Sequence, residues 1–157
     1  MTRSVTVLTN PTAGGGRAVH ASRRAVTRLR ERELDVSTVE GRTAGDALEL
    51  LKRAVGCGTD AVVAVGGDGV VNLALQVIAG TDTPLGLIPA GTGNDLARTL
   101  GVPLDDPTRA ADLVVDGVVR SIDLGRVGTR WFGTVLSSGF DSLVTERAGR
   151  LQWLAGP

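Results

Sequence analysis

Two glycine-rich segments hold the residues best suited to chemistry in this chain of 157 residues. They are Val65-Gly66-Gly67-Asp68-Gly69 and Pro89-Ala90-Gly91-Thr92-Gly93-Asn94-Asp95. Each follows a short aliphatic run and precedes a helical pattern, so each would bring bare backbone N–H groups up to an anion. Each also supplies an aspartate, and carboxylates are ligands that Mg²⁺ prefers. The pair predicts a nucleotide phosphate site and indicates phosphoryl transfer.

Each turn also has a purely structural interpretation. Asp68 could be the N-cap of the helix after the first turn, and Asn94 or Asp95 the N-cap after the second. Alternatively, Thr92 and Asn94 offer a hydroxyl and an amide to phosphate or ribose. Ligands of open α/β sheets bind outside the carboxyl ends of the strands, which is where both turns are expected. The functional interpretation is therefore favoured over capping alone.

Aliphatic runs and amphipathic stretches alternate along the chain, which predicts an α/β fold with a mostly parallel sheet covered on both faces. Strands are expected over 5–8, 34–39, 61–65 and 85–88. Helices are expected over 17–33, from Thr43 onward, from the first turn to about 79, after the second turn to about 100, and over 108–116. Thr43 and Asp46 form a capping-box pattern. Segments 118–124 and 131–136 predict paired strands joined by a turn over 125–130.

Composition restricts the classes of function. Lys+Arg and Asp+Glu number 17 each, and this zero formal charge argues against a nucleic-acid partner. The single cysteine, Cys57, fits a reducing cytoplasm. No stretch resembles a signal peptide or a transmembrane segment. We expect a cytoplasmic protein that could still visit a membrane surface.

The first predicted helix is rich in arginine. A solvated helix face is the favoured interpretation, and attraction to anionic lipid headgroups is the alternative. The basic residues are Arg17, Arg23, Arg24, Arg28, Arg30 and Arg32, opposed by Glu31.

Taken in order, the motifs resemble the diacylglycerol kinase catalytic domain, a family that includes soluble bacterial lipid kinases and is similar to sphingosine and ceramide kinases. The matching motifs are Asn10-Pro11-Thr12-Ala13-Gly14, Thr43-x-Gly45-Asp46-Ala47, Gly66-Gly67-Asp68-Gly69, Pro89-x-Gly91-Thr92-x-Asn94-Asp95-x-Ala97-Arg98, Ile122-Asp123-Leu124-Gly125 and Ser138-Gly139-Phe140-Asp141. The resemblance implies a three-layer αβα nucleotide-binding domain over 1–141, like the N-terminal domain of the NAD kinase and diacylglycerol kinase superfamily. Residues 142–157 would begin the connection to a β-rich C-terminal domain that this chain does not include.

The resemblance also implies ATP and Mg²⁺ as cofactors and transfer of the γ-phosphoryl group to a lipid hydroxyl at a membrane surface, with diacylglycerol as the first candidate. Asp68 would lie at the phosphates and their metal. Asp68, Asp95 and Asp123 would be the catalytic carboxylates, the last two forming a polar network with Asn94. The nucleotide would be lined by Asn10, Pro11, Thr12, Ala13, Gly14, Arg17, Thr43, Gly66, Gly67, Asp68, Gly69, Val70, Asn72, Gly91, Thr92 and Asn94.

Three departures from the family pattern keep alternatives open, and the largest is the absent β-rich C-terminal domain described above. Val70 stands where the family has threonine, and Leu73 where it has an acid after Asn72. One alternative is a truncated or degenerate copy that binds nucleotide without catalysis. Another is NAD kinase-like activity, which shares the first turn. The apolar residues Trp153 and Leu154 indicate a possible homo-oligomer.

Overall fold

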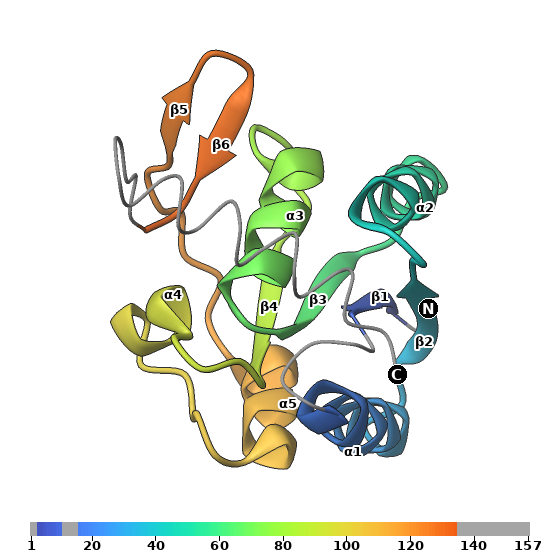
Figure 1. Ribbon diagram of the computed structural model, residues 1–157. Helices are drawn as coiled ribbons and strands as arrows, with labels where there is room; N and C mark the ends of the chain where they lie inside the picture. The colour runs from blue at the N-terminus through green and yellow to red at the C-terminus, as the bar shows by residue number, and fades with distance from the viewer. Residues whose placement is uncertain (1–2, 11–15, 135–157) are drawn as a thin grey trace.

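The computed structural model describes residues 3–10 and 16–134, and within these ranges a parallel sheet forms the centre of the molecule (Figure 1). Its strands are β1 (Ser4–Thr9), β2 (Asp35–Glu40), β3 (Ala61–Gly66) and β4 (Leu85–Pro89), in the spatial order β2-β1-β3-β4. All three pairings are parallel. The strands predicted from the aliphatic runs are confirmed, and each boundary differs by at most one residue.

Helices cover both faces of this sheet, so the predicted three-layer arrangement is confirmed. Helices α1 (Arg17–Glu31) and α5 (Pro107–Asp116) lie on one face, and α2 (Ala44–Gly56) and α3 (Asp68–Ile78) on the other (Figure 1). Because side chains alternate across a strand, Val63 packs with α1 and α5 while its neighbour Ala64 packs with α2 and α3. The short helix α4 (Asp95–Thr99) follows β4 and buries Leu96 and Ala97 on the α3 side.

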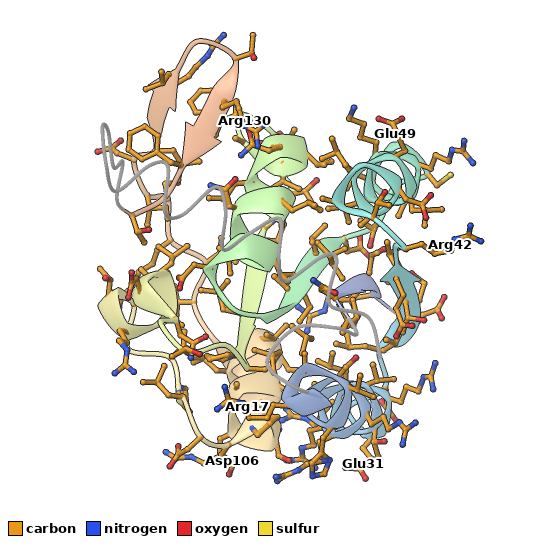
Figure 2. All side chains as sticks on the ribbon, in the orientation of Figure 1. Arg17, Glu31, Arg42, Glu49, Asp106 and Arg130 are labelled. Atoms are coloured by element: carbon orange, nitrogen blue, oxygen red, sulfur yellow. The ribbon has the colours of Figure 1, made fainter. Side chains whose placement is uncertain are left out.

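Charged side chains surround this core at the surface. Figure 2 labels exposed charges on three different elements, namely Glu31 on α1, Glu49 on α2 and Arg130 near the tip of the hairpin described below. No helix within the described ranges is long and apolar enough to cross a bilayer.

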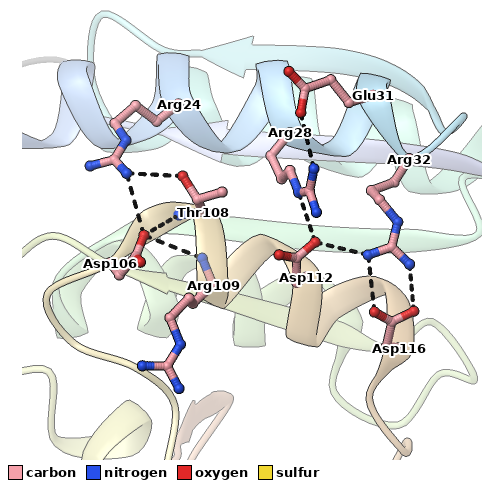
Figure 3. Close-up of polar contacts among 9 residues, drawn as sticks. All are labelled: Arg24, Arg28, Glu31, Arg32, Asp106, Thr108, Arg109, Asp112 and Asp116. Carbon is pink, nitrogen blue, oxygen red and sulfur yellow. Dashed lines mark hydrogen bonds and ion pairs between the residues drawn. The ribbon is translucent and has the colours of Figure 1, made fainter.

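Arg24 and Arg28 of α1 and its C-cap residue Arg32 reach across to α5, so the expected solvated face is partly engaged in interhelical contacts (Figure 3). Arg28 Nε and Arg32 both contact Asp112 Oδ1 at 2.8 Å. These hydrogen bonds, Arg28 first, hold the pKa of the Asp112 carboxyl below its usual range. The remaining interhelical pairs are Arg24 with Asp106 at 3.4 Å and Arg32 with Asp116 at 2.6 Å. Half-exposed arginines thus join α1 to α5.

A small antiparallel hairpin follows α5, formed by β5 (Gly125–Val127) and β6 (Arg130–Phe132). The predicted pairing of 118–124 with 131–136 is wrong for the described residues. Gly128, at φ +57°, closes a two-residue turn, and the Phe132 ring lies over Gly125, where a Cβ would overlap it. Val118 is 84% exposed, so its apolar character does not mark a buried strand.

Candidate functional site

The sheet topology brings two loops together at one edge. From β1 the chain passes to β2 on one side, and it then returns past β1 to β3 on the other side. The carboxyl ends of β1 and β3 are therefore adjacent, with Thr9 opposite Val65, and the loops that leave them diverge. Such a switch point is where open α/β sheets bind ligands. Buried Asn10 follows β1 here, and the first glycine turn follows β3.

The two glycine turns lie in direct contact. A Cβ on Gly67 would lie 3.1 Å from the Gly91 Cα, and a Cβ on Gly91 would overlap the Gly67 Cα. The Ala90 N–H also donates to the Gly66 carbonyl at 2.9 Å. The close approach leaves no room for a side chain at Gly91 and only tight space at Gly67, so the two turns form one continuous backbone surface.

In the first turn, Gly66 adopts φ +155° and Gly67 is the N-cap of α3, so Asp68 is the first helical residue. The capping role considered for Asp68 is therefore wrong. The N–H groups of Asp68 and Gly69 have no acceptor among the described residues. Val70 turns its side chain into the core, where it is 8% exposed and packs against Gly66. Only its backbone could face a ligand.

In the second turn, Asn94 is held in the left-handed region at φ 56°. Its Oδ1 accepts from the Gly91 N–H at 3.0 Å, and its Nδ2 donates to the Gly91 carbonyl at 2.9 Å. Asn94 is buried and occupies the N-cap position of α4, but its side chain closes the turn instead of capping the helix. Its amide is thus engaged by Gly91, while the neighbouring Thr92 is exposed.

The carboxylates of Asp68 and Asp95 border the same small space. Asp68 Oδ1 accepts from the Asp95 N–H at 2.8 Å, which joins the two turns through a side chain. A Cβ on Gly93 would lie 2.7 Å from Asp68 Oδ2 and 3.5 Å from Asp95 Oδ1. Only the absence of a side chain at Gly93 leaves room beside both carboxylates.

This donor set fits a magnesium ion whose remaining coordination positions are filled by a bound ligand and water. Mg²⁺ is commonly bound by one or two carboxylates together with substrate phosphates and waters. No group of three or more His, Cys, Asp or Glu side chains that could hold a metal occurs within residues 3–10 and 16–134. The pair Asp68 and Asp95 suits a shared protein–phosphate site better than an all-protein metal cage.

Three predicted site residues lie elsewhere or have other partners. Asp123 is exposed and makes no hydrogen bond or ion pair with another described residue, so the expected network with Asn94 and Asp95 is not formed within that part of the chain. Thr43 caps α2, because its side chain accepts from the Asp46 N–H at 3.1 Å. Asn72 Nδ2 approaches the Trp131 carbonyl of the hairpin at 3.5 Å.

The remaining predictions fall on the first loop and the C-terminal segment. Arg17 is exposed and begins α1 after Gly16, the N-cap of that helix, at φ +89° (Figure 2). Outside the described residues lie Pro11, Thr12, Ala13, Gly14, the motif Ser138-Gly139-Phe140-Asp141, the boundary at 141, Trp153 and Leu154.

Two side chains that position this region were not predicted from the sequence. Arg98 donates its Nε–H to the Gly93 carbonyl at 2.8 Å. Gln76 exchanges two hydrogen bonds with the Trp131 backbone, at 2.8 and 3.0 Å, and thereby fastens β6 to α3. Arg98 lies one turn into the helix that follows a glycine turn, and long helical side chains point back toward the N-terminus of their helix. This position could have indicated a contact with the turn.

A small hollow opens between the two turns. It is lined by Gly67, Asp68 and Asn94 together with aliphatic side chains of β3, β4 and α3, and its volume of about 10 Å³ holds one water at most.

The chain matches the model of the diacylglycerol kinase catalytic domain over residues 4–127. It is 56% identical over 157 residues to a diacylglycerol kinase of Mycobacterium tuberculosis, covering 97% of this chain and 51% of that protein. It is 36% identical over 135 residues to a diacylglycerol kinase of Bacillus subtilis, covering 85% of this chain and 45% of that protein. A probable YegS-like lipid kinase of Pseudomonas fluorescens is 44% identical over 104 residues, covering 65% of this chain and 34% of that protein.

The fold is likewise similar to solved structures. A crystal structure of a putative diacylglycerol kinase from Bacillus anthracis superposes with a TM-score of 0.71 at 28% identity, covering 83% of this chain and 47% of that one. The chain spans about half the length of the diacylglycerol kinases that it matches.

Proposed function

The chain belongs to the diacylglycerol kinase catalytic-domain family, and from this premise we propose that it supplies the nucleotide-binding part of an ATP- and Mg²⁺-dependent lipid kinase. The reaction is transfer of the γ-phosphoryl group of ATP to a lipid hydroxyl. Diacylglycerol is the proposed acceptor because it is named in the relatives at 56% and 36% identity. Residues 1–141 form the proposed nucleotide-binding domain.

One observation carries this proposal, namely the contact between the two glycine turns at the switch point. Their backbones leave N–H groups that have no acceptor among the described residues beside the carboxylates of Asp68 and Asp95. Backbone N–H groups fit phosphate oxygens, and carboxylates fit the metal that accompanies them. The same small surface therefore offers donors to the anion and ligands to its cation.

Backbone N–H groups and side-chain carboxylates have different proposed roles in this site. The N–H groups of Gly67, Asp68 and Gly69, with the Thr92 hydroxyl, bind and orient the phosphates, and this positioning is the main contribution that a protein makes to phosphoryl transfer. Asp68 and Asp95 would hold Mg²⁺, which neutralises charge on the phosphate oxygens when bound. Asp123, exposed after α5, is proposed as a further catalytic carboxylate on the family resemblance alone.

The remaining nucleotide contacts are proposed on the family resemblance. They comprise Asn10, Pro11, Thr12, Ala13, Gly14, Arg17, Thr43, Gly66, Val70, Asn72, Gly91 and Asn94. For Val70 the contact is limited to the backbone, because its side chain is buried.

Calorimetric titration of the chain with ATP, with and without Mg²⁺, tests the nucleotide part of this proposal. We expect saturable binding that Mg²⁺ strengthens. A flat trace on a sample shown by circular dichroism to be folded would contradict it.

The transfer step needs a separate assay, in which labelled ATP is incubated with diacylglycerol-containing vesicles. Label in phosphatidic acid supports the kinase. Binding without transfer supports the alternative of a nucleotide-binding chain that lacks catalysis. Conversion of NAD to NADP in a parallel incubation would favour NAD kinase-like activity instead.

A further inference from the structure

Arg98 lies on α4 beside the proposed phosphate site, and its side chain reaches back to the turn before its own helix. Its Nε–H donates to the Gly93 carbonyl at 2.8 Å. Arg98 is exposed, and no other polar partner of its guanidinium occurs in the described part of the chain. The Nε–H bond, rather than an ion pair, therefore defines where this side chain lies.

The Gly93 carbonyl belongs to the same peptide unit as the Asn94 N–H, which lies at the proposed phosphate site. In a trans peptide the C=O of Gly93 and the N–H of Asn94 point in opposite directions. Holding the carbonyl therefore also fixes the direction of the Asn94 N–H. That N–H, like those of Thr92 and Gly93, has no acceptor among the described residues.

Among the described residues, Arg98 is the only hydrogen-bond donor to the Gly93 carbonyl, and so the only group that restrains the Gly93–Asn94 peptide at that oxygen. Asn94 holds Gly91 by two hydrogen bonds, and Asp68 holds the Asp95 N–H. The peptide between them joins a glycine to a residue at φ 56°, a combination that tolerates peptide flips because glycine has few forbidden conformations. A flip would replace the Asn94 N–H with a carbonyl oxygen, which repels an anion.

We propose that Arg98 is a positioning residue of the phosphate site: through the Gly93 carbonyl it fixes the Gly93–Asn94 peptide and presents the Asn94 N–H as a donor for a phosphate oxygen of ATP. This inference rests on the proposed function for the identity of the anion. The restraint on the peptide is independent of that function.

Substitutions at Arg98 separate the hydrogen bond from the charge. In Arg98→Gln the amide nitrogen occupies the same place along the side chain as Nε, so the donor is kept and the charge is lost. Arg98→Met has a similar length without a donor. The control Arg109→Met removes an exposed arginine whose side chain has no partner in the described residues.

The first readout is the dissociation constant for Mg²⁺–ATP, measured by calorimetry on the full chain. We expect R98Q to lie within about 3-fold of the unaltered protein and R98M to bind about 10-fold more weakly, the size of effect that one hydrogen bond produces. Equal losses in R98Q and R98M, with affinity retained in Arg98→Lys, would assign a direct charge contact to Arg98 and overturn the positioning role.

The second readout needs no nucleotide. The N–H groups of Gly91 and Asp95 are hydrogen-bonded to side chains within or across the turn, so their hydrogen exchange, followed by NMR, reports how firmly the turn is held. Exchange should accelerate about 10-fold in R98M and remain near the unaltered rate in R98Q and R109M. Unchanged exchange in R98M overturns the proposal. Faster exchange in a protein that binds no ATP overturns the phosphate role together with the proposed function, and it leaves the restraint established.

Discussion

The backbones of Gly67 and Gly91 pack so closely that a Cβ at Gly91 would overlap the Gly67 Cα, and one at Gly67 would lie only 3.1 Å from the Gly91 Cα. The two motifs are separated by the whole of α3 and β4 in sequence, yet they form a single surface. The proximity follows from the adjacent pairing of β3 and β4, in which Gly66 stands opposite Pro89. The proposed phosphate site therefore depends on a strand pairing as much as on the glycines.

Gly91→Ala should separate the two turns. Its Cβ would overlap the Gly67 Cα and lie 3.0 Å from Asn94 Oδ1, so we expect a loss of about 1–3 kcal/mol in the free energy of unfolding, as for other overpacked sites. Urea denaturation measures this loss. Gly56→Ala is the matched control, because the same methyl group there meets nothing within 4 Å and should be neutral or slightly stabilising. Equal stability of the two variants would contradict the close contact.

The parts of the fold that were predicted correctly are those where local pattern and burial agree. The run 61–65 is aliphatic throughout and becomes β3, one of the two inner strands of the sheet, which is buried on both faces. The hairpin was misplaced because Val118 and Val119 suggested a strand, whereas the register is set by Gly128 and by Phe132 packing over Gly125. Turn geometry and ring packing of this kind cannot be predicted from the hydrophobic pattern alone.

Thr43 offers a test of capping against ligand contact. Its hydroxyl accepts from the Asp46 N–H at 3.1 Å, so Thr43→Ala should lower the free energy of unfolding by about 1 kcal/mol. Thr43→Asn should restore stability, because asparagine is an equally good N-cap. Thermal denaturation gives this comparison. If T43N is as stable as the unaltered protein but binds Mg²⁺–ATP more weakly, the hydroxyl contacts nucleotide as well as the helix.

The ion pairs between α1 and α5 should make stability depend on pH. Hydrogen bonds from Arg28 and then Arg32 lower the pKa of Asp112 in the folded state, so its contribution is complete above the unfolded pKa of about 3.9 and is lost as the pH falls through the folded pKa. Asp112→Asn should therefore be less stable than the unaltered protein at pH 7. The difference should shrink as the pH is lowered from about 5 toward 2.

Urea denaturation at several pH values checks this expectation. Asp82→Asn is the control, because Asp82 is exposed and makes no hydrogen bond or ion pair with another described residue. A constant difference between D112N and the unaltered protein across this range would show that the ion pairs with α1 do not stabilise the fold.

The residue types of the candidate site could be predicted from the sequence, but the contacts that each side chain makes could not. Asp68 and Asp95 were marked by their place after aliphatic runs, and the structure brings both beside Gly93. The sequence could not show that the amide of Asn94 is engaged by Gly91, because that bond depends on its left-handed backbone. Nor could it show that Arg98 donates to the Gly93 carbonyl, because this bond depends on where α4 begins.

Substitutions at Asp68 should separate the hydrogen bond that its carboxylate accepts from the Mg²⁺ contact proposed for it. Its Oδ1 accepts from the Asp95 N–H at 2.8 Å, and asparagine keeps an oxygen at that place while losing the charge. Asp68→Asn should therefore retain most of the stability of the fold. It should lose the gain in ATP affinity that Mg²⁺ provides, because a neutral amide is a much weaker ligand for Mg²⁺. Asp68→Ala should lose both.

Calorimetric titration with ATP, with and without Mg²⁺, combined with thermal denaturation, distinguishes these outcomes. Asp60→Asn is the matched control, because Asp60 also accepts a backbone N–H, that of Ser4 at 2.6 Å, at the opposite end of β3. D60N should keep the full effect of Mg²⁺. If D68N kept it too, the metal would have to be held by Asp95 and the phosphates alone, and Asp68 would serve only to join the second turn to the first.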